Sequence, residues 1–241
     1  MNLKGKRLLV IGGSSGIGLA VARTAAEQGA ALLIVGRNAE KLEDIAEALG
    51  KDGTSVDAKA LDASSPEALA QLAAEMGEVD HLVSTVGGAM GGGFLSNSEE
   101  TVRGAIDEKF FVALRIAQAL TPALRDGGSV TLTSGAGGRP HNASGAIVGN
   151  AAIRMLVEGL AVELAPRVRA NAVAPTWMDT PLWRGVPRAD VEATKAHFAK
   201  QIPLLRTATV DEVAQAYLFA ITNGFLNGQT LVIDGGLGLV S

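Results

Sequence analysis

The sequence of 241 residues contains no cysteine and few aromatic residues, which make up 4% of the chain and include a single tyrosine, Tyr217. The lack of cysteine excludes disulfides, thiolate catalysis and cysteine-ligated metals, and no other metal site is expected. The first residues lead into an apolar run without the hydrophobic core of a signal peptide. No apolar stretch approaches the roughly 18 residues of a membrane helix. We therefore expect a cytoplasmic protein without a membrane partner.

Charge of either sign is also scarce. Charged residues make up 19% of the chain, the formal net charge is −4, and the two signs are scattered. Such a balance argues against nucleic acid as a partner. The 47% of hydrophobic residues is typical of a globular protein, and the length suits one α/β domain over residues 1–241.

Short apolar runs alternate with helical patterns along the chain. We interpret as strands the runs 8–11, 31–35, 56–61, 81–86, 130–133, 167–174 and 230–233. Nearly continuous apolar strands are typical of a parallel sheet covered on both faces. The alternation predicts a doubly wound α/β domain of the Rossmann type with a mostly parallel central sheet.

Two other segments stand out between these strands. A helix is expected after Gly145, with an apolar stripe that ends before Pro166. The stripe consists of Ile153, Leu156, Val157, Leu160, Ala161 and Leu164. Residues 175–209 hold four prolines and both tryptophans, and we interpret them as a substrate-loop region over the site. Trp177, Met178 and Trp183 would line an apolar substrate pocket, or belong to the core or a subunit interface.

A glycine-rich loop joins the first strand to the first helix. Glycines allow a tight turn and close approach to a pyrophosphate, and the helix N-terminus offers free N–H groups. The alternative is an ordinary structural turn. We expect dinucleotide binding by Gly12, Ser14, Ser15, Gly16, Ile17 and Gly18.

The end of the second strand predicts which dinucleotide binds. NAD-binding domains carry a carboxylate there for the ribose 2′-hydroxyl, whereas a 2′-phosphate needs a cation. This strand ends in Arg37 and Asn38, without an acid. An arginine fork suits a phosphate, which favours NADP(H) over a merely solvated arginine.

With these motifs the chain resembles a short-chain dehydrogenase/reductase from about Gly5 to Gly236. Gly12, Gly16 and Gly18 match the family's TGxxxGxG, with Ile11 in place of the threonine. The resemblance further implies cofactor contacts from Asp62, Gly87, Pro175 and Thr180. Asp62 follows the third strand, Gly87 ends the counterpart of the family's NNAG stretch, and Pro175 and Thr180 follow the counterpart of its RVNAVAPG stretch.

The catalytic residues implied by the family are only partly present. Ser134 matches the serine that polarises the substrate carbonyl. The tyrosine and lysine of the YxxxK motif correspond to Ala146 and Asn150, so the usual proton donor is absent. Asn150 is left as a candidate for the nicotinamide ribose. Tyr217 lies in a late helix whose family counterpart is structural.

Lys109 occupies the position of the family's asparagine. Residues 4, 7 and 11 positions later are apolar, which places this lysine on a buried stripe. We hypothesise that its ammonium lies near Ser134, with a depressed pKa, and donates the proton. The alternative is a side chain that reaches out to solvent. His141, in a loop that borders the substrate in this family, is a second candidate acid, or simply exposed.

Two functions follow from this interpretation. The first is an NADP(H)-dependent oxidoreductase with a non-standard active site that reduces a small apolar carbonyl or imine. The alternative is a catalytically silent NADP(H)-binding sensor or scaffold protein. Relatives of this fold assemble through two long helices, here about 98–122 and 145–165, so we expect a homotetramer or homodimer.

Overall fold

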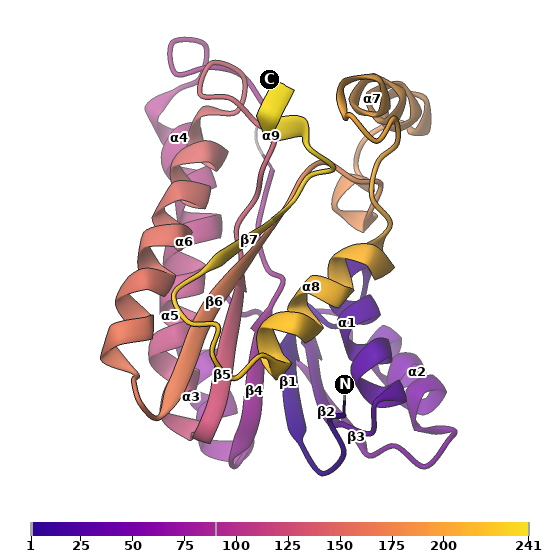
Figure 1. Cartoon of the computed structure of the whole chain (residues 1–241), viewed down its shortest axis with the longest axis vertical. Coiled ribbons are helices and arrows are strands. Elements are labelled where there is room, and N and C mark those ends of the chain that lie inside the picture. Colours follow the sequence, from indigo (N-terminus) through magenta and orange to yellow (C-terminus); the bar gives the residue numbers. More distant parts are fainter. Residues whose placement is uncertain (1, 90, 241) are drawn as a thin grey trace.

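Seven parallel strands form one sheet in the computed structural model, which describes residues 2–89 and 91–240. Their order across the sheet is β3-β2-β1-β4-β5-β6-β7 (Figure 1). The strands are β1 Arg7–Ile11, β2 Ala31–Gly36, β3 Val56–Ala60, β4 Val79–Ser84, β5 Leu124–Thr133, β6 Val168–Pro175 and β7 Thr230–Ile233. The predicted doubly wound, parallel α/β fold is confirmed.

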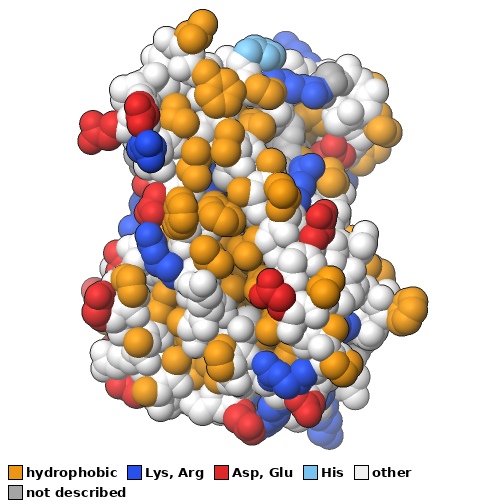
Figure 2. Space-filling model, turned by 90° about the vertical axis from the view of Figure 1, so that its left-hand side faces the viewer, with side chains coloured by type: hydrophobic (Ala, Val, Ile, Leu, Met, Phe, Trp, Pro, Cys, Tyr) orange, Lys and Arg blue, Asp and Glu red, His pale blue; other side chains and the backbone are white. Residues whose placement is uncertain are grey.

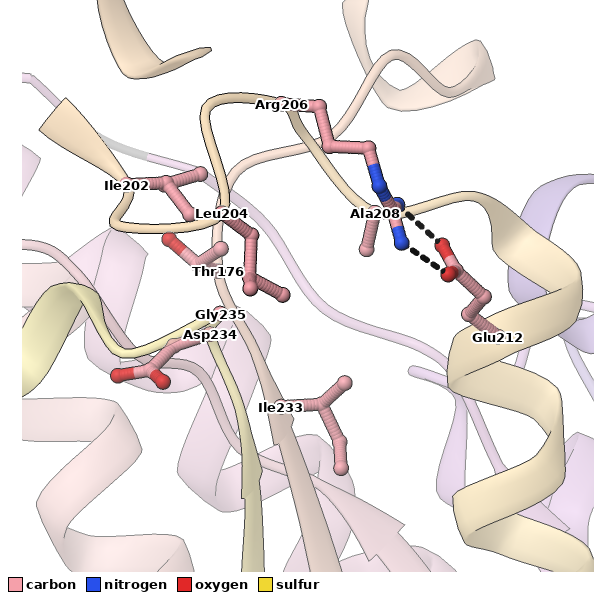
Figure 3. A pocket seen from close by; sticks show the side chains of 9 residues that line it. All are labelled: Thr176, Ile202, Leu204, Arg206, Ala208, Glu212, Ile233, Asp234 and Gly235. Atoms are coloured by element: carbon pink, nitrogen blue, oxygen red, sulfur yellow. Dashed lines mark hydrogen bonds and ion pairs between the residues drawn. The ribbon is translucent and has the colours of Figure 1, made fainter. Parts of the chain in front are cut away.

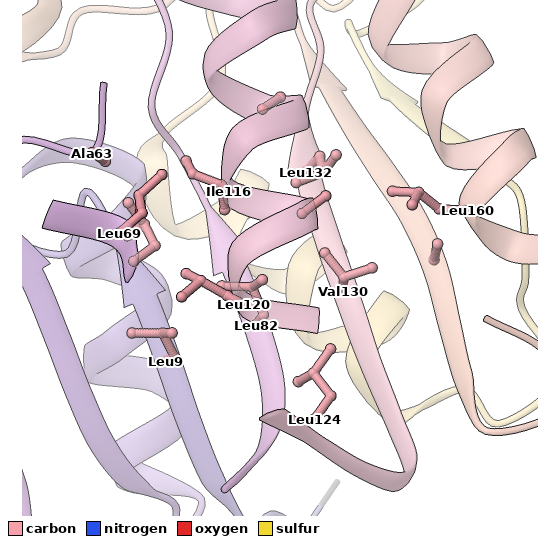
Figure 4. Close-up of a cluster of buried hydrophobic side chains, with 14 of the residues drawn as sticks. Leu9, Ala63, Leu69, Leu82, Ile116, Leu120, Leu124, Val130, Leu132 and Leu160 are labelled. Carbon is pink, nitrogen blue, oxygen red and sulfur yellow. The ribbon is translucent and has the colours of Figure 1, made fainter. Parts of the chain in front are cut away.

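Helices cover both faces of this sheet. α1, α2 and α8 pack on one face, and α3, α5 and α6 on the other. The helices are α1 Gly16–Glu27, α2 Ala39–Gly50, α3 Pro66–Glu75, α4 Glu99–Ile106, α5 Val112–Leu120, α6 Ser144–Glu163, α7 Arg188–Gln201, α8 Val210–Thr222 and α9 Leu237–Val240, with the single turns η1 Asp107–Phe111, η2 Thr121–Ala123 and η3 Pro181–Trp183. Figure 4 shows leucines of β1, β4, β5, α3 and α5 filling one of these layers.

The strand order reverses between β1 and β4. β1 pairs with β2 on one side and with β4 on the other, so successive crossovers run in opposite directions from this point. In open α/β sheets a ligand crevice forms at such a switch point, beyond the carboxyl ends of the strands. The loops after β1, β4 and β5 therefore define where a site is expected.

Two strands, β4 and β5, begin two or more residues before their predicted starts, and the other predicted starts agree within one residue. β4 begins at Val79, two residues early, because the charge of Asp80 is neutralised rather than solvated. Burial alone would raise the pKa of Asp80, but the Arg7 amide, Lys6 and Arg125 outweigh it and lower that pKa. β5 begins at Leu124, before a polar and glycine-rich stretch that hides the strand in the sequence.

α6 is the one helix in the described part of the chain that is long and apolar enough to cross a membrane. The sequence had indicated no such stretch. The inner side of α6 packs against β6 and β5, and Ile153 and Val157 are fully covered. Its composition is thus also that of a helix in a protein core.

Residues 175–209 carry two helical segments, η3 and α7, rather than a plain loop. Trp177 stacks on Trp183 at 5.9 Å between ring centroids and on Phe198 at 5.7 Å. Met178 is 5% exposed and belongs to the core beneath them. The two tryptophans therefore form an aromatic stack that fixes α7 to the end of β6.

Candidate functional site

The turn after β1 is built so that only glycine fits at two positions. A Cβ on Gly12 would lie 2.5 Å from Thr85 Oγ1, and one on Gly18 would lie 2.2 Å from the Gly12 carbonyl oxygen. Gly12 also has a φ of +88°, which L side chains rarely adopt. The turn brings the start of α1 against the end of β4.

No side chain among the described residues caps the backbone donors at the N-terminus of α1. Ser15 is the N-cap residue, but its side chain makes no capping hydrogen bond. Thr180 and Pro181 lie over Gly16, within 3.6 to 3.7 Å of a Cβ built there. The structure thus brings the predicted glycine loop, including Ile17, next to Thr180, and these free N–H groups suit an anionic group.

A second cluster lies where β2 and β3 end. A Cβ on Gly36 would meet Ser14 Oγ at 2.8 Å, so the Ser14 hydroxyl lies over the residue before Arg37. The Ser64 amide and hydroxyl, helped by the charge of Arg37, lower the pKa of Asp62. Arg37 is exposed and forms no ion pair with any residue that the structure describes. Asn38 instead caps α2, accepting from the Lys41 amide at 2.8 Å.

Thr85 is a residue of this site that the sequence did not single out. Its hydroxyl donates to the carbonyls of Ile11 and Gly12 at 3.3 and 3.4 Å. It therefore ties the loop after β4, which leads to Gly87, to the glycine turn after β1. In the sequence, the one feature that pointed to Thr85 was its position in the counterpart of the family's NNAG stretch.

Ser134 lies beyond the end of β5 and is 3% exposed. Its hydroxyl donates to the backbone carbonyl of Asn150 on α6 at 2.9 Å. The side-chain Oδ1 of Asn150 is buried without a partner among the described residues. A buried acceptor left unpaired costs free energy, which singles out the Asn150 carboxamide within this site. The Pro175 carbonyl accepts from the Ala136 amide at 2.9 Å and holds the loop that follows Ser134.

Lys109 lies in η1, a π-helical turn that joins α4 to α5. Such turns are frequent at functional sites. The residue is 9% exposed, and its Nζ is 3.7 Å from the Cβ position of Gly87. Burial lowers the pKa of Lys109 to about 8, and the charge of Glu108 opposes that shift. The ammonium therefore faces the loop after β4 rather than solvent.

The remaining predicted residue, His141, is exposed in the loop before α6. Its carbonyl lies against Gly93, where a Cβ would be 2.7 Å away. The contacts thus join Lys109 to Gly87 and Ser134 to Asn150, with the Lys109 stem against Gly149, the residue before Asn150, and they tie His141 to neither pair. Ala146 is 7% exposed, one helical turn before Asn150.

The single tyrosine belongs to the core. Tyr217 is fully buried, and burial raises the pKa of its phenol above the ordinary value. Thr133 donates to the Ser84 carbonyl at 2.6 Å, so the Tyr217 hydroxyl, 2.5 Å from Thr133 Oγ1, acts as a donor to it. Tyr217 thus fixes the ends of β4 and β5 and is unsuited to proton transfer.

Replacing Tyr217 by phenylalanine is expected to lower the free energy of unfolding by about 1 kcal/mol, because one buried hydrogen bond is lost. Replacing Thr133 by valine should cost about 2 kcal/mol or more, since it leaves the Tyr217 hydroxyl buried without an acceptor. Urea unfolding of both variants measures the difference. Equal losses would contradict the donor and acceptor roles assigned here.

No group of three or more histidine, aspartate or glutamate side chains could hold a metal ion within residues 2–89 and 91–240. A small pocket of about 100 Å³ lies apart from Ser134 and Lys109, between the turn after α7, the end of β7 and the start of α8. Figure 3 shows Leu204 and Ile233 lining it and the Arg206–Glu212 ion pair at its edge. None of the predicted catalytic residues lines this pocket.

Comparison with known proteins places this geometry in a family. A family model described as enoyl-(acyl carrier protein) reductase matches residues 12–238. An uncharacterized oxidoreductase of Mycobacterium tuberculosis is 33% identical over 98% of this chain and 93% of its own. The short-chain dehydrogenase/reductase fsr5 of Gibberella fujikuroi is 32% identical over 97% and 95%.

Solved structures agree with these relatives. An NADPH-bound short chain oxidoreductase from Pseudomonas aeruginosa PAO1, described as containing an atypical catalytic center, superposes with a TM-score of 0.89. It is 28% identical, and the match covers 98% of each chain. The chain belongs to the short-chain dehydrogenase/reductase family of oxidoreductases.

Proposed function

We propose that this protein is an NADP(H)-dependent oxidoreductase that reduces a small apolar carbonyl compound, with Lys109 in place of the family's tyrosine as proton donor. The observation that carries the proposal is the buried Lys109 ammonium, which faces Gly87 next to the turn of α6 that holds Ser134. The family's YxxxK tyrosine and lysine are replaced by Ala146 and Asn150.

The glycine turn and its surroundings fit NADP(H). Free N–H groups at the start of α1 suit the pyrophosphate, and Gly12 and Gly18 allow the tight turn that places them at the end of β1. Arg37 and the Ser14 hydroxyl offer a cation and a donor to a 2′-phosphate. Asp62 would contact the adenine, and the unpartnered Asn150 Oδ1 suits a hydroxyl of the nicotinamide ribose. Gly87, Pro175 and Thr180 would border the nicotinamide.

Bound NADPH supplies the hydride for the carbonyl carbon. The Ser134 hydroxyl would turn away from the Asn150 carbonyl and donate its hydrogen bond to the carbonyl oxygen of the substrate, which polarises that group. The Lys109 ammonium would stabilise the negative charge that develops on this oxygen and transfer a proton to it, leaving a neutral amine that solvent reprotonates. With a pKa near 8, Lys109 is mostly protonated at neutral pH.

The charge of Lys109 also favours a carbonyl over an imine substrate. An iminium ion is already cationic, and a second positive charge beside it in a buried site is unfavourable. A neutral carbonyl gains negative charge during hydride transfer and is stabilised instead. The aromatic stack of Trp177, Trp183 and Phe198 makes residues 175–209 a suitable apolar cover for such a substrate.

We expect the protein to act as a homo-oligomer. Figure 2 shows hydrophobic side chains gathered along the middle of the face formed by α4, α5 and α6. Phe111, Val148, Met155 and Val162 contribute exposed apolar surface, and Met155 and Val162 are 71% and 79% exposed. Apolar patches of this kind are typical of subunit interfaces.

Fluorescence titration with NADPH and then NADH, followed by a screen of ketones, quinones and cyclic imines for NADPH oxidation, tests the function. We expect tighter binding of NADPH and turnover with ketones. Binding without turnover of any class would favour the alternative of a silent NADP(H)-binding sensor or scaffold protein. Absence of binding would contradict the role of the glycine turn.

A further inference from the structure

The contact between η1 and α6 depends on the absence of a side chain at Gly149. A Cβ built there would lie 2.8 Å from Lys109 Cβ, 3.0 Å from its Cδ and 3.5 Å from its Cγ. The first of these atoms is fixed by the backbone, so a new rotamer of Lys109 cannot remove the overlap. The lysine stem therefore lies along α6 only because residue 149 is glycine.

The same contact determines where the ammonium lies. The stem crosses Gly149, and Nζ ends 3.7 Å from the Cβ position of Gly87. The next residue of α6, Asn150, carries the carbonyl that accepts from Ser134. One turn of α6 thus fixes both the lysine and the serine of the proposed site.

We propose that Gly149 is a positioning residue that lets Lys109 reach the site. A side chain at this position would separate η1 from α6, withdraw the ammonium from Gly87 and admit water around it. This inference rests on the proposed function of Lys109, but the environment of its amine can be measured without turnover.

Desolvation is the main influence on the pKa of Lys109, and few charged groups act on it. Glu108, on the same turn, favours its protonated form. The other charged groups on the neighbouring elements have partners of their own or are exposed: Arg115 pairs with Asp107, Arg103 pairs with Glu99, Arg154 donates to the Gly135 carbonyl, and Glu158 and Glu163 are exposed. A change in the pKa of Lys109 would thus report mainly on its burial.

Gly149→Ala and Gly159→Ala form a matched pair of variants on one helix. A Cβ on Gly159 would meet only Glu163 Oε1, at an ordinary 3.8 Å. Both substitutions favour the helix, and only the first disturbs Lys109. NMR titration of protein labelled with ¹⁵N-lysine, with Lys109 assigned through its loss in Lys109→Met, gives the pKa of the amine directly.

We expect Gly149→Ala to raise the pKa of Lys109 by about one unit or more, to move the alkaline limb of the kcat profile with it, and to lower kcat about tenfold or more. NADPH affinity should stay unchanged, and Gly159→Ala should change none of these. An unaltered Lys109 pKa in Gly149→Ala would overturn the inference. A raised pKa in a protein that reduces no substrate would support it and contradict the proposed function.

A second comparison applies if Gly149→Ala folds poorly. In the double variant with Lys109→Gly, the overlapping atoms are gone, so alanine at position 149 should no longer destabilise the protein relative to Lys109→Gly alone. Additive effects of the two substitutions on the urea midpoint would show that Gly149 does not act through Lys109.

Discussion

Replacing Lys109 by methionine is expected to abolish most turnover and to make the fold more stable. Methionine matches the length of much of the stem and removes the buried charge. Loss of a proton donor should lower kcat by about 10² to 10⁴-fold, with NADPH binding retained. The free energy of unfolding should rise by about 3 kcal/mol at pH 7, because the pKa of Lys109 lies near 8 and that of a free lysine near 10.5.

The sign of this effect predicts its pH dependence. Between pH 8 and 10.5 the unfolded chain binds a proton at Lys109 that the native chain does not, so native stability rises with pH across this window. Below pH 8 both states are protonated and the full cost of burial is present. The stability gain of Lys109→Met should thus be largest below pH 8 and small above pH 10.5.

Urea unfolding at pH 7 and pH 10.5 measures the stability change, and the ketone assay measures kcat. In the native enzyme kcat should fall as pH rises through about 8, because the neutral amine cannot donate. Lys51→Met, at an exposed lysine after α2, serves as the matched control and should change neither quantity. Full activity of Lys109→Met would exclude Lys109 as the donor.

Replacing Arg37 by aspartate is expected to reverse the cofactor preference. The substitution removes the cation available to a 2′-phosphate and places a carboxylate against it, so the Kd for NADPH should rise about 100-fold. NADH lacks this phosphate, and its ribose 2′-hydroxyl can donate to the new carboxylate. Its affinity should be unchanged or higher.

Fluorescence titration of both cofactors tests this reversal. Lys51→Asp introduces the same change of charge at the far end of α2 and controls for long-range electrostatics. A Kd for NADPH that stays within a few-fold of the native value in Arg37→Asp would show that this arginine does not bind the phosphate. In that case the NADP(H) preference would need another cation.

The sequence by itself determined the layered fold. Alternation of apolar strands with helical patterns needs only local periodicity, and parallel strands buried on both faces leave one class of architecture. The glycine turn was equally readable, because the φ of Gly12 and the contact at Gly18 admit no side chain. The predicted starts of β4 and β5 were wrong because polar residues near each start hide the strand in the sequence. Asp80 in β4 is neutralised by residues distant in sequence, and β5 starts before a polar stretch.

Only the tertiary structure decided how the candidate catalytic groups are arranged. Periodicity placed Lys109 on a buried stripe, but it could not show that its stem crosses Gly149 or that its Nζ faces Gly87. Nor could it show that Asn38 is committed to capping α2. Helical periodicity records which side of a helix is apolar, whereas these contacts depend on how closely two helices and a loop approach one another, and on a π-helical turn that the sequence pattern does not reveal.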